Sequence, residues 1–454
     1  MSIRLRHLVR IGPRPEKAQL LRDNIEMTFA PMDALADGLG GLDTSLSRPV
    51  GEVVSGSYNF FAEGDLLLAK VTPCFENGKK ALAEGLANGV GFATSEVHVI
   101  RPDTRRINPR YLLYLLGAED FRAAAMASMT GAGGLRRVSE AAVLNYRPRV
   151  TDLSTQKAIA DFLDRETARI DQLIEKKQRL IRLLEEREEA AFLDAVTGKD
   201  FDGPKRFSGV EWIGEIPSHW TAPKITHVAK QETGHTPSRR VAEYWVPEEC
   251  VIPWVSLADV WQLRSGETVY IEETVEKISY VGMANSAARL LPAGTVILSR
   301  TASVGFAGVL AKPMATTQDF AAWICGARIR PKYLYYTLRA MKPEFRRLMM
   351  GSTHQTIYMP DIRSFRTPLP PLVEQDRICE KLDRAIAKFR SASAILRTSI
   401  DRLREFRSAL ITAAVTGQID VTTWGRRGET DRRLERIEEE MSAPPGRGEV
   451  AAAS

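Results

Sequence analysis

The sequence predicts a mixed α/β (α+β) protein in which two domains alternate with two long helices that pack as an antiparallel coiled coil. Two observations lead to this prediction. The segment that begins at Leu153 recurs without a gap from Leu372, so the two copies are 219 residues apart. Within both copies, apolar residues repeat with the seven-residue spacing of a coiled coil. A period this long exceeds any solenoid unit, so it indicates two copies of a whole module, related by a pseudo-twofold internal repeat.

Each repeated segment is predicted to be one continuous helix of about 45 residues, or roughly 65–70 Å. Both segments end in Ala-Val-Thr-Gly, at Gly198 and Gly417, and glycine is common just past a helix end. The predicted seam residues are Leu163, Ile170, Leu184 and Ala191 with Leu173 and Leu180 beside them, then Phe389, Leu396, Leu403 and Leu410 with Ile386 and Ile400. One such segment would suit an oligomerisation zipper, but two in one chain can pack on each other.

The regions that precede the helices repeat more weakly. A turn glycine, a buried strand and a cation follow one another in both, from Gly64 to Lys70 and from Gly294 to Arg300. The helices are therefore closer copies than the domains, which suggests one frame with two different surfaces. The predicted domains are residues 1–152 and 200–371, and the predicted helices are residues 153–199 and 372–421. Residues 422–454 form a charged tail that we expect to begin as a short helix and to become disordered.

Composition excludes several classes of protein. The 454 residues contain no apolar run as long as a membrane span, and the N-terminal residues lack the pattern of a secretory signal. The four cysteines are widely separated, as expected for reduced thiols and not for disulfides or a zinc site. The net charge of +6 is modest, so a nucleic-acid ligand would need basic residues gathered on one face. We therefore expect a cytoplasmic protein.

Several segments resemble the specificity (S) subunit of a type I restriction–modification system. These segments are Pro368 to Gln375, the Ala-Val-Thr-Gly endings, Val210 to Trp220, Gly234 to Ser238, Tyr244-Trp245, Ile252 to Trp254 and Gly351 to Thr353. The resemblance covers residues 1–421, and the duplicated architecture is its most specific part. The first domain departs from the family pattern, because it has no clear Gly-x-Thr-Pro-Ser block and starts abruptly at Arg4.

The resemblance implies a non-catalytic reader of double-stranded DNA with two target-recognition domains. It also implies the partners of this chain, which are two methyltransferase (M) subunits and restriction/translocase (R) subunits. In such a complex the chain is no enzyme by itself, although the whole assembly is a DNA adenine methyltransferase and restriction endonuclease. The partner subunits would bind S-adenosylmethionine, ATP and Mg, and we expect no cofactor in this chain.

The residues themselves give no sign of a catalytic or metal site. The chain has no Asn/Asp-Pro-Pro-Tyr/Phe methyltransferase motif, and its glycine-rich stretches lack the strand-and-helix context of a nucleotide-binding loop. Gly78-Lys79 and Gly198-Lys199 lack the upstream glycine of a P-loop. The six histidines show no metal-ligand spacing. We therefore expect a binding protein.

Candidate DNA contacts are cations and hydrogen-bonding side chains in the loops of both domains. Arginine and lysine can contact guanine edges or phosphates, and glutamine can pair with adenine. The candidates are Lys70, Lys79, Lys80, Arg136 and Arg137 in the first domain, and Ser238, Arg239, Arg240, Arg300, Thr301, His354 and Gln355 in the second. For each one taken alone, a solvated surface group is the simpler explanation. A coiled-coil scaffold with two modules that do not bind DNA therefore remains the alternative.

Some charged positions between the seams recur in both helices, although the seams do not need them. They are Arg165 and Glu186 in the first helix and Arg384 and Glu405 in the second. We expect them in the docking surface for two M subunits, and a solvated helix face is the simpler explanation.

Two diverged domains on a helical spacer cannot read the same few bases. The DNA site should therefore be bipartite and asymmetric.

Overall fold

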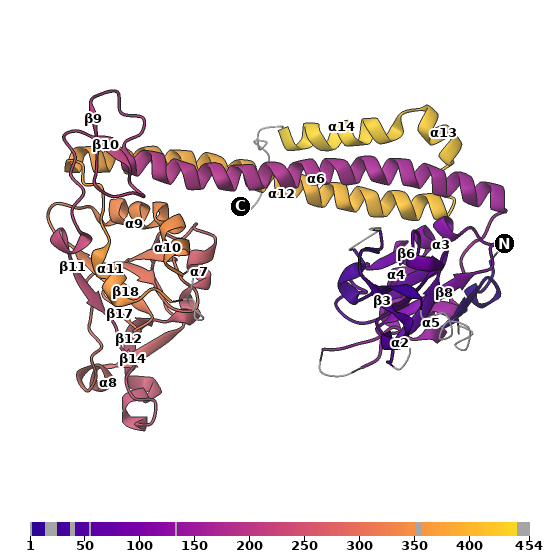
Figure 1. Ribbon diagram of the computed structural model, residues 1–454, viewed down its shortest axis with the longest axis horizontal. Helices are drawn as coiled ribbons and strands as arrows, with labels where there is room; N and C mark the ends of the chain where they lie inside the picture. Colours follow the sequence, from indigo (N-terminus) through magenta and orange to yellow (C-terminus); the bar gives the residue numbers. More distant parts are fainter. Residues whose placement is uncertain are drawn as a thin grey trace, which may run out of the picture. The chain divides into compact units, whose positions relative to one another are not determined.

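The structure is a computed structural model that describes residues 2–13, 25–36, 41–53, 56–131, 134–349 and 356–442. The chain divides into two compact units, Met1–Arg179 with Ile395–Ser454, and Leu180–Ala394. Each unit contains one of the predicted domains together with part of both long helices (Figure 1). Within the described ranges, no helix combines the length and the apolar character that crossing a membrane requires.

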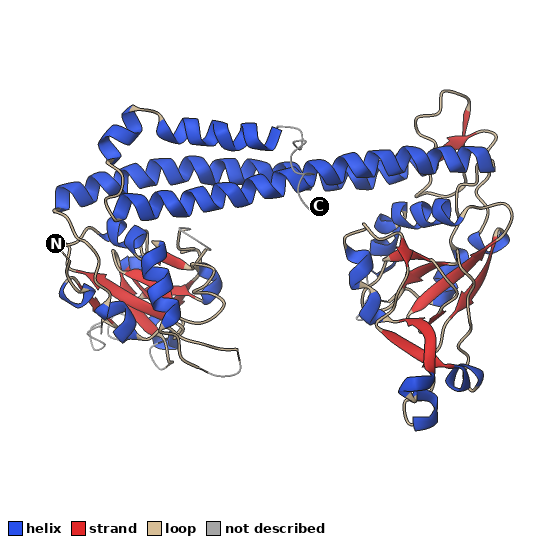
Figure 2. Cartoon of the chain, turned by 180° about the vertical axis from the view of Figure 1, so that it is seen from behind, coloured by secondary structure: helices blue, strands red, loops and turns tan. Residues whose placement is uncertain are grey.

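Domain 1 consists of β-strands with short helices around them (Figure 2). Its strands are β1 (Val9–Ile11), β2 (Glu26–Ala30), β3 (Ser47–Pro49), β4 (Asn59–Ala62), β5 (Leu66–Ala69), β6 (Lys80–Leu82), β7 (Val90–Ala93) and β8 (Val97–Pro102). Its α-helices are α2 (Val50–Val53), α3 (Pro109–Leu115), α4 (Glu119–Ala127) and α5 (Glu140–Asn145). One sheet has the strand order β1-β8-β5-β6 and the other β3-β2-β7-β4. The pair β2 and β7 is parallel.

Domain 2 repeats most of this topology, with β13 added to one sheet and no counterpart of β4 in the other. Its strands are β11 (Ala229–Thr233), β12 (Cys250–Val255), β13 (Tyr270–Ile271), β14 (Glu276–Ser279), β15 (Val296–Ser299), β16 (Ala307–Leu310), β17 (Ala315–Thr316) and β18 (Phe320–Cys325). Its α-helices are α7 (Trp261–Arg264), α8 (Tyr280–Ala284), α9 (Pro331–Ala340), α10 (Lys342–Met349) and α11 (Met359–Ser364), and a hairpin of β9 (Lys205–Phe207) and β10 (Glu215–Pro217) precedes them. The sheet β11-β18-β15-β16-β13 corresponds to β1-β8-β5-β6, and the sheet β14-β12-β17 corresponds to β3-β2-β7. The pair β12 and β17 is parallel, as β2 and β7 are.

The strand that follows each turn glycine is buried. All four residues of β5 and all four of β15 are buried. Gly64 and Gly294 precede them with φ of +82°, a backbone conformation that favours glycine. The predicted turn glycines and buried strands are therefore confirmed, and Lys70 and Arg300 follow directly after the two strands.

The two long helices are α6 (Leu153–Thr197) and α12 (Leu372–Val415). Each ends at its predicted glycine, with φ of +70° at Gly198 and +73° at Gly417. The amide of Gly198 donates to the carbonyl of Ala195, and the amide of Gly417 donates to that of Ala414. These bonds satisfy carbonyls that a helix end would otherwise leave unpaired.

The apolar seam is formed within each unit. In the first unit Leu163 and Ile170 of α6 belong to one buried cluster with Leu403 and Leu410 of α12. The helices run antiparallel there, since the first unit holds the start of α6 together with the end of α12, and Asp171 pairs with Arg407 between them (Figure 1). In the second unit Phe192 and Val196 of α6 share a cluster with Leu382 and Ile386 of α12.

One predicted seam residue is not in the seam. Leu180 is 49% exposed, whereas Ser399, the aligned residue of the second copy, is 1% exposed. The prediction for Leu180 was therefore wrong. Heptad spacing defines a stripe along a helix, but burial depends on which side chains of the partner cover that stripe.

The tail is more ordered than its composition predicts. Helices α13 (Val421–Arg426) and α14 (Glu429–Ser442) follow α12, and α14 runs back along the long helices of the first unit (Figure 1). Leu434 and Ile437 of α14 pack against the core of that unit. The predicted disorder is thus corrected for residues 422–442, and residues 443–454 lie outside the described part of the chain.

Candidate DNA interface

A buried glutamine attaches each domain to its own long helix. The side-chain oxygen of Gln156 accepts from the amide of Asn108 at 2.8 Å. Its side-chain nitrogen donates to the carbonyls of Arg106 and Thr151, at 3.2 and 2.8 Å. Gln156 is fully buried, so these three bonds satisfy the side chain without water.

Gln375 makes the same three bonds in the second unit. Its oxygen accepts from the amide of Arg330 at 2.8 Å, and its nitrogen donates to the carbonyls of Arg328 and Pro370, both at 2.9 Å. Gln375 is also fully buried. The two domains are therefore fixed to α6 and α12 in equivalent ways.

A tyrosine and a helix aspartate add a second repeated attachment. The hydroxyl of Tyr114 donates to Asp164 at 2.7 Å, and that of Tyr336 donates to Asp383. A cation of the same domain pairs with each aspartate, Arg110 with Asp164 at 3.0 Å and Lys332 with Asp383 at 2.6 Å. These attachments leave the loops that follow β5 and β15 available for another role.

In domain 2, Arg300 joins three loops at the end of β15. Its backbone amide donates to the carbonyl of Asp319 at 2.8 Å. Its guanidinium donates to the carbonyls of Gln318 and Ile357, at 3.0 and 3.3 Å. The hydroxyl of Thr301 donates to the carboxylate of Asp319. Arg300 and Thr301 therefore help to hold these loops in place, and both residues are also part of the loop surface.

The segment Gly234 to Ser238 packs against the same loops. A Cβ atom on Gly234 would lie 1.8 Å from the carbonyl oxygen of Thr316, so only glycine fits there. The next residue, His235, donates its amide to that carbonyl at 3.0 Å. Thr236 then donates its hydroxyl to the side chain of Gln318 at 2.8 Å. The Gly-His-Thr-Pro-Ser segment is thereby linked to the loop that Arg300 holds.

Arg239 lies over an aromatic ring beside this segment. Its guanidinium carbon is 3.8 Å from the ring centroid of Trp245, and its Nη2 is 2.9 Å from a carboxylate oxygen of Glu276. The indole of Trp245 donates to the carbonyl of Ser238 at 3.0 Å. Ser238 and Arg240 are exposed, and Arg240 makes no ion pair within the described ranges. The arginine plane is therefore fixed by stacking, while its neighbours face solvent.

Domain 1 places Lys70 where domain 2 has Arg300. The amide of Lys70 donates to the carbonyl of Glu96, and its carbonyl accepts from the amide of Val138, at 3.0 and 2.8 Å. Arg137 donates two hydrogen bonds to the carboxylate of Glu96, at 2.9 and 3.0 Å. This hydrogen bonding lowers the pKa of Glu96. Arg136 pairs with Glu76 at 3.3 Å. Pairs as exposed as these are weak and could exchange a carboxylate for a phosphate.

Two neighbouring lysines have roles that the sequence did not predict. Lys79 donates to the carbonyls of Met32 and Leu35, at 3.3 and 2.9 Å. Lys80 is only 4% exposed, and burial lowers its pKa to about 7. A side chain buried to this extent cannot reach DNA, so Lys80 is removed from the candidates. The other two candidates, His354 and Gln355, lie outside the described residues.

The repeated charges of the long helices are exposed. Arg165 and Glu186 of α6 and Arg384 and Glu405 of α12 all face solvent. Arg384 donates to the carbonyl of Glu380 in its own helix, and Glu405 lies 3.9 Å from Arg402. They are therefore free of any seam role, as their spacing predicts.

The sequence did not indicate the carboxylates that pair with the candidate cations. Glu76, Glu96 and Glu276 are remote in sequence from Arg136, Arg137 and Arg239, and only the folded chain brings them together. No periodicity or motif predicts such pairs. Among the described residues, no group of histidine, cysteine and carboxylate side chains could hold a metal ion.

A family model and several known proteins that resemble this chain all describe type I specificity subunits. Residues 217–397 match the family model described as "Type I restriction modification DNA specificity domain". The EcoEI specificity subunit of a type I restriction enzyme from Escherichia coli is 36% identical over 144 residues, covering 32% of this chain and 24% of that protein. The chain thus aligns with about a quarter of that relative's length. The putative MjaX specificity subunit from Methanocaldococcus jannaschii is 23% identical over 367 residues, 79% of each chain.

Solved structures show the same fold. A chain from a structural study of complex assembly and conformational transition of the type I R-M system has a TM-score of 0.67 at 18% identity, covering 92% of this chain and 98% of that chain. The HsdS subunit from Thermoanaerobacter tengcongensis has a TM-score of 0.51 at 18% identity, covering 92% and 97%. These likenesses confirm the predicted fold class. Together, the matched domain, the relatives and the repeated architecture make this chain similar to the specificity subunits of type I restriction–modification systems.

Proposed function

We propose that this chain gives a type I restriction–modification complex its DNA specificity by reading a bipartite, asymmetric site. Each domain would read one short block of base pairs. The observation that supports this most is the repeated attachment, in which Gln156 and Gln375 make the same three bonds in two units. Equivalent attachment of two diverged domains suits two separate half-sites better than one continuous site.

The loop surfaces support different half-sites for the two domains. Domain 2 presents Arg239 over Trp245 beside the Gly234 to Ser238 segment. Domain 1 has Lys70 and the paired Arg136 and Arg137 instead. Because base contacts depend on the side chain and its position, surfaces this different should read different sequences.

This chain itself would carry out no chemical step. Its residues would bind and position DNA, while two M subunits would bind S-adenosylmethionine and R subunits would bind ATP and Mg. The exposed, repeated charges Arg165 and Arg384, with Glu186 and Glu405, would lie in two equivalent surfaces for the M subunits. Because α6 and α12 repeat, the chain would present nearly the same surface twice, which favours two M subunits for each copy of this chain.

Reconstitution with the M subunit tests this proposal. Light scattering after size exclusion should give two M subunits for each copy of this chain. The complex should then retain duplexes from a random DNA pool, and the retained sequences should share two blocks separated by unspecified base pairs. A complex that retains no DNA would favour the alternative of a scaffold with two modules that do not bind DNA. A stoichiometry of one would contradict the repeated docking surface.

A further inference from the structure

The helices α13 and α14 lie outside the duplicated unit and form a groove with α12. The repeat ends at Gly417, and α14 then covers one side of the helices in the first unit (Figure 1). Its Asp431 pairs with Arg169 of α6, and its Glu438 pairs with Lys177 of α6 at 2.6 Å. The apolar Ile437 is 6% exposed. This side of α14 is therefore occupied by contacts within the unit.

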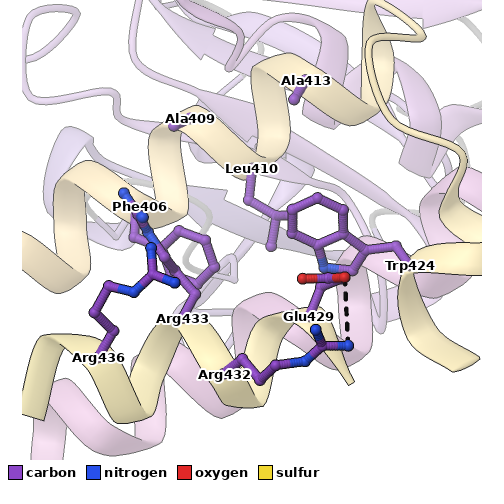
Figure 3. A pocket seen from close by; sticks show the side chains of 9 residues that line it. All are labelled: Phe406, Ala409, Leu410, Ala413, Trp424, Glu429, Arg432, Arg433 and Arg436. Atoms are coloured by element: carbon purple, nitrogen blue, oxygen red, sulfur yellow. Dashed lines mark ion pairs between the residues drawn. The ribbon is translucent and has the colours of Figure 1, made fainter. Parts of the chain in front are cut away.

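The arginines of α14 line a different side. A cavity of about 360 Å³ lies between α12, α13 and α14, and Figure 3 shows the side chains around it. Its apolar lining consists of Phe406, Ala409, Leu410, Ala413 and Trp424, and its cations are Arg432, Arg433 and Arg436. The helix thus directs Asp431 and Glu438 toward α6, and three arginines together with Glu429 toward the cavity.

Two of these arginines are in no ion pair among the described residues. Arg432 pairs with Glu429 at 3.4 Å, which is the ion pair drawn in Figure 3. Arg433 and Arg436 form no ion pair with another described residue. They are three positions apart, so they lie on the same face of α14. Two free guanidinium groups on one face favour carboxylate or phosphate ligands, to which arginine can donate two parallel bonds.

The groove continues beyond this cavity. A second cavity of about 170 Å³ shares Phe406, Ala409, Arg433 and Arg436 with the first. The indole nitrogen of Trp424 donates to the hydroxyl of Thr430 at 3.0 Å, so its polar atom is satisfied and its ring is left as an apolar wall. The result is an elongated groove with an apolar floor and an edge on which the arginines outnumber the carboxylates of Glu405, Glu429 and Glu440.

We propose that this groove, lined by α12, α13 and α14, binds an acidic peptide segment of a protein partner. One large apolar side chain would occupy the cavity beside Phe406 and Trp424, and flanking carboxylates would pair with Arg433 and Arg436. The binding is separate from DNA reading, because all of these residues belong to the tail and the end of α12. The apolar contact supplies most of the affinity, since exposed ion pairs contribute little.

A peptide fits this groove better than nucleic acid does. The apolar floor needs an apolar group, which a sugar–phosphate backbone does not provide. Glu405 and Glu440 also line the second cavity, and they would repel a continuous polyanion. A peptide can place carboxylates only where the two arginines lie.

Selection from a random peptide library against the full chain tests the proposal. The selected peptides should be enriched in Asp and Glu around one Leu, Met, Phe or Trp. A double variant, Arg433→Glu with Arg436→Glu, should lose at least tenfold in affinity for them and select basic peptides instead. Ala409→Tyr should also weaken binding at least tenfold, because Ala409 is exposed and a larger side chain there fills the groove without disturbing the core.

The matched control is Arg426→Glu with Arg427→Glu, which changes the charge of the tail equally but lies outside the groove. This control should bind the selected peptides as the parent chain does. Thermal unfolding of every variant separates lost binding from lost folding. A selection without acidic preference, or one that the Arg433 and Arg436 changes leave unaltered, would overturn the proposal. Displacement of the peptide by random duplex DNA, dependent on the same two arginines, would overturn it in favour of a nucleic-acid surface.

Discussion

Tyr111 donates its hydroxyl proton to the carbonyl of Val415 at 3.2 Å, although 304 residues separate them in sequence. The second unit has the equivalent bond, from Tyr333 to the carbonyl of Val196 at 3.3 Å. Each domain therefore contacts the last turn of the long helix that belongs to the other copy of the repeat. The first unit is consequently complete only when the end of α12 is present.

Loss of the Tyr111 hydroxyl should destabilise the first unit. Burial raises the pKa of Tyr111 to about 12, so its hydroxyl stays protonated and remains a donor. Tyr111→Phe should lower the free energy of unfolding by about 1 kcal/mol, because two carbonyls lose a donor. Hydrogen exchange should increase at the start of α6 and at the end of α12. Tyr270→Phe, at a residue 46% exposed, is the control and should change little.

The two buried glutamines should respond strongly to loss of their amide nitrogen. Gln375→Glu keeps an acceptor for the amide of Arg330 but faces the carbonyls of Arg328 and Pro370 with oxygen instead of a donor. We expect a loss of about 2–4 kcal/mol, since two buried acceptors stay unpaired beside a carboxylate. Urea unfolding measures it, with the exposed Gln172→Glu as control. An equal effect of the two substitutions would contradict the attachment role.

Lys80 should make stability depend on pH. Its pKa is about 7 in the folded chain, against an ordinary value of 10.5. Burial of the charged amine is the main cause of this lowered pKa, and repulsion from Arg407 and Arg122 adds to it. Between these two values the unfolded chain binds one proton more, so stability rises with pH across this window and is lowest below pH 7. Lys80→Met should therefore be most stabilising relative to the parent chain below pH 7, and this advantage should shrink toward pH 10.5.

Urea unfolding of both chains across this pH range measures the effect. The exposed Lys157→Met is the control and should show no such trend. A stability difference between Lys80→Met and the parent chain that does not vary with pH would contradict the lowered pKa.

Arg300 should matter for one half-site only. Arg300→Ala removes a guanidinium that donates to the carbonyls of Gln318 and Ile357, so the loops of domain 2 lose a fixed geometry. If Arg300 also contacts a base, binding should weaken by about 1–3 kcal/mol, with discrimination lost only in the block that domain 2 reads. Gel shifts with duplexes altered in one block at a time measure this. Lys70→Ala, at the equivalent place in domain 1, should affect the other block.

Local sequence features predicted the helices and their ends well. The repeat and the glycines after it predicted where α6 and α12 begin and that they end beside Gly198 and Gly417, because helix periodicity and glycine caps are properties of neighbouring residues. Burial could not be predicted in the same way. Leu180 and Ser399 align in the repeat and have opposite exposures, since packing partners come from elsewhere in the chain.

The candidate site was predicted only in part. Lys70 and Arg300 were placed at equivalent strand ends because the turn glycine and the buried strand are local patterns. The burial of Lys80 and the pairing of Arg239 with Glu276 depend on tertiary contacts, so no spacing rule could indicate them. Order in α14 could have been predicted from Leu434 and Ile437, which are three positions apart on one face.

Methylome sequencing of cells that carry this gene, compared with cells that lack it, is the direct test of a bipartite, asymmetric DNA site. We expect one methylated motif with two short, different blocks separated by unspecified base pairs. A second strain, in which residues 200–371 are replaced by the corresponding domain of a relative, should change one block and leave the other intact. A continuous or palindromic motif, or a motif unchanged by the replacement, would show that the two domains do not read separate half-sites.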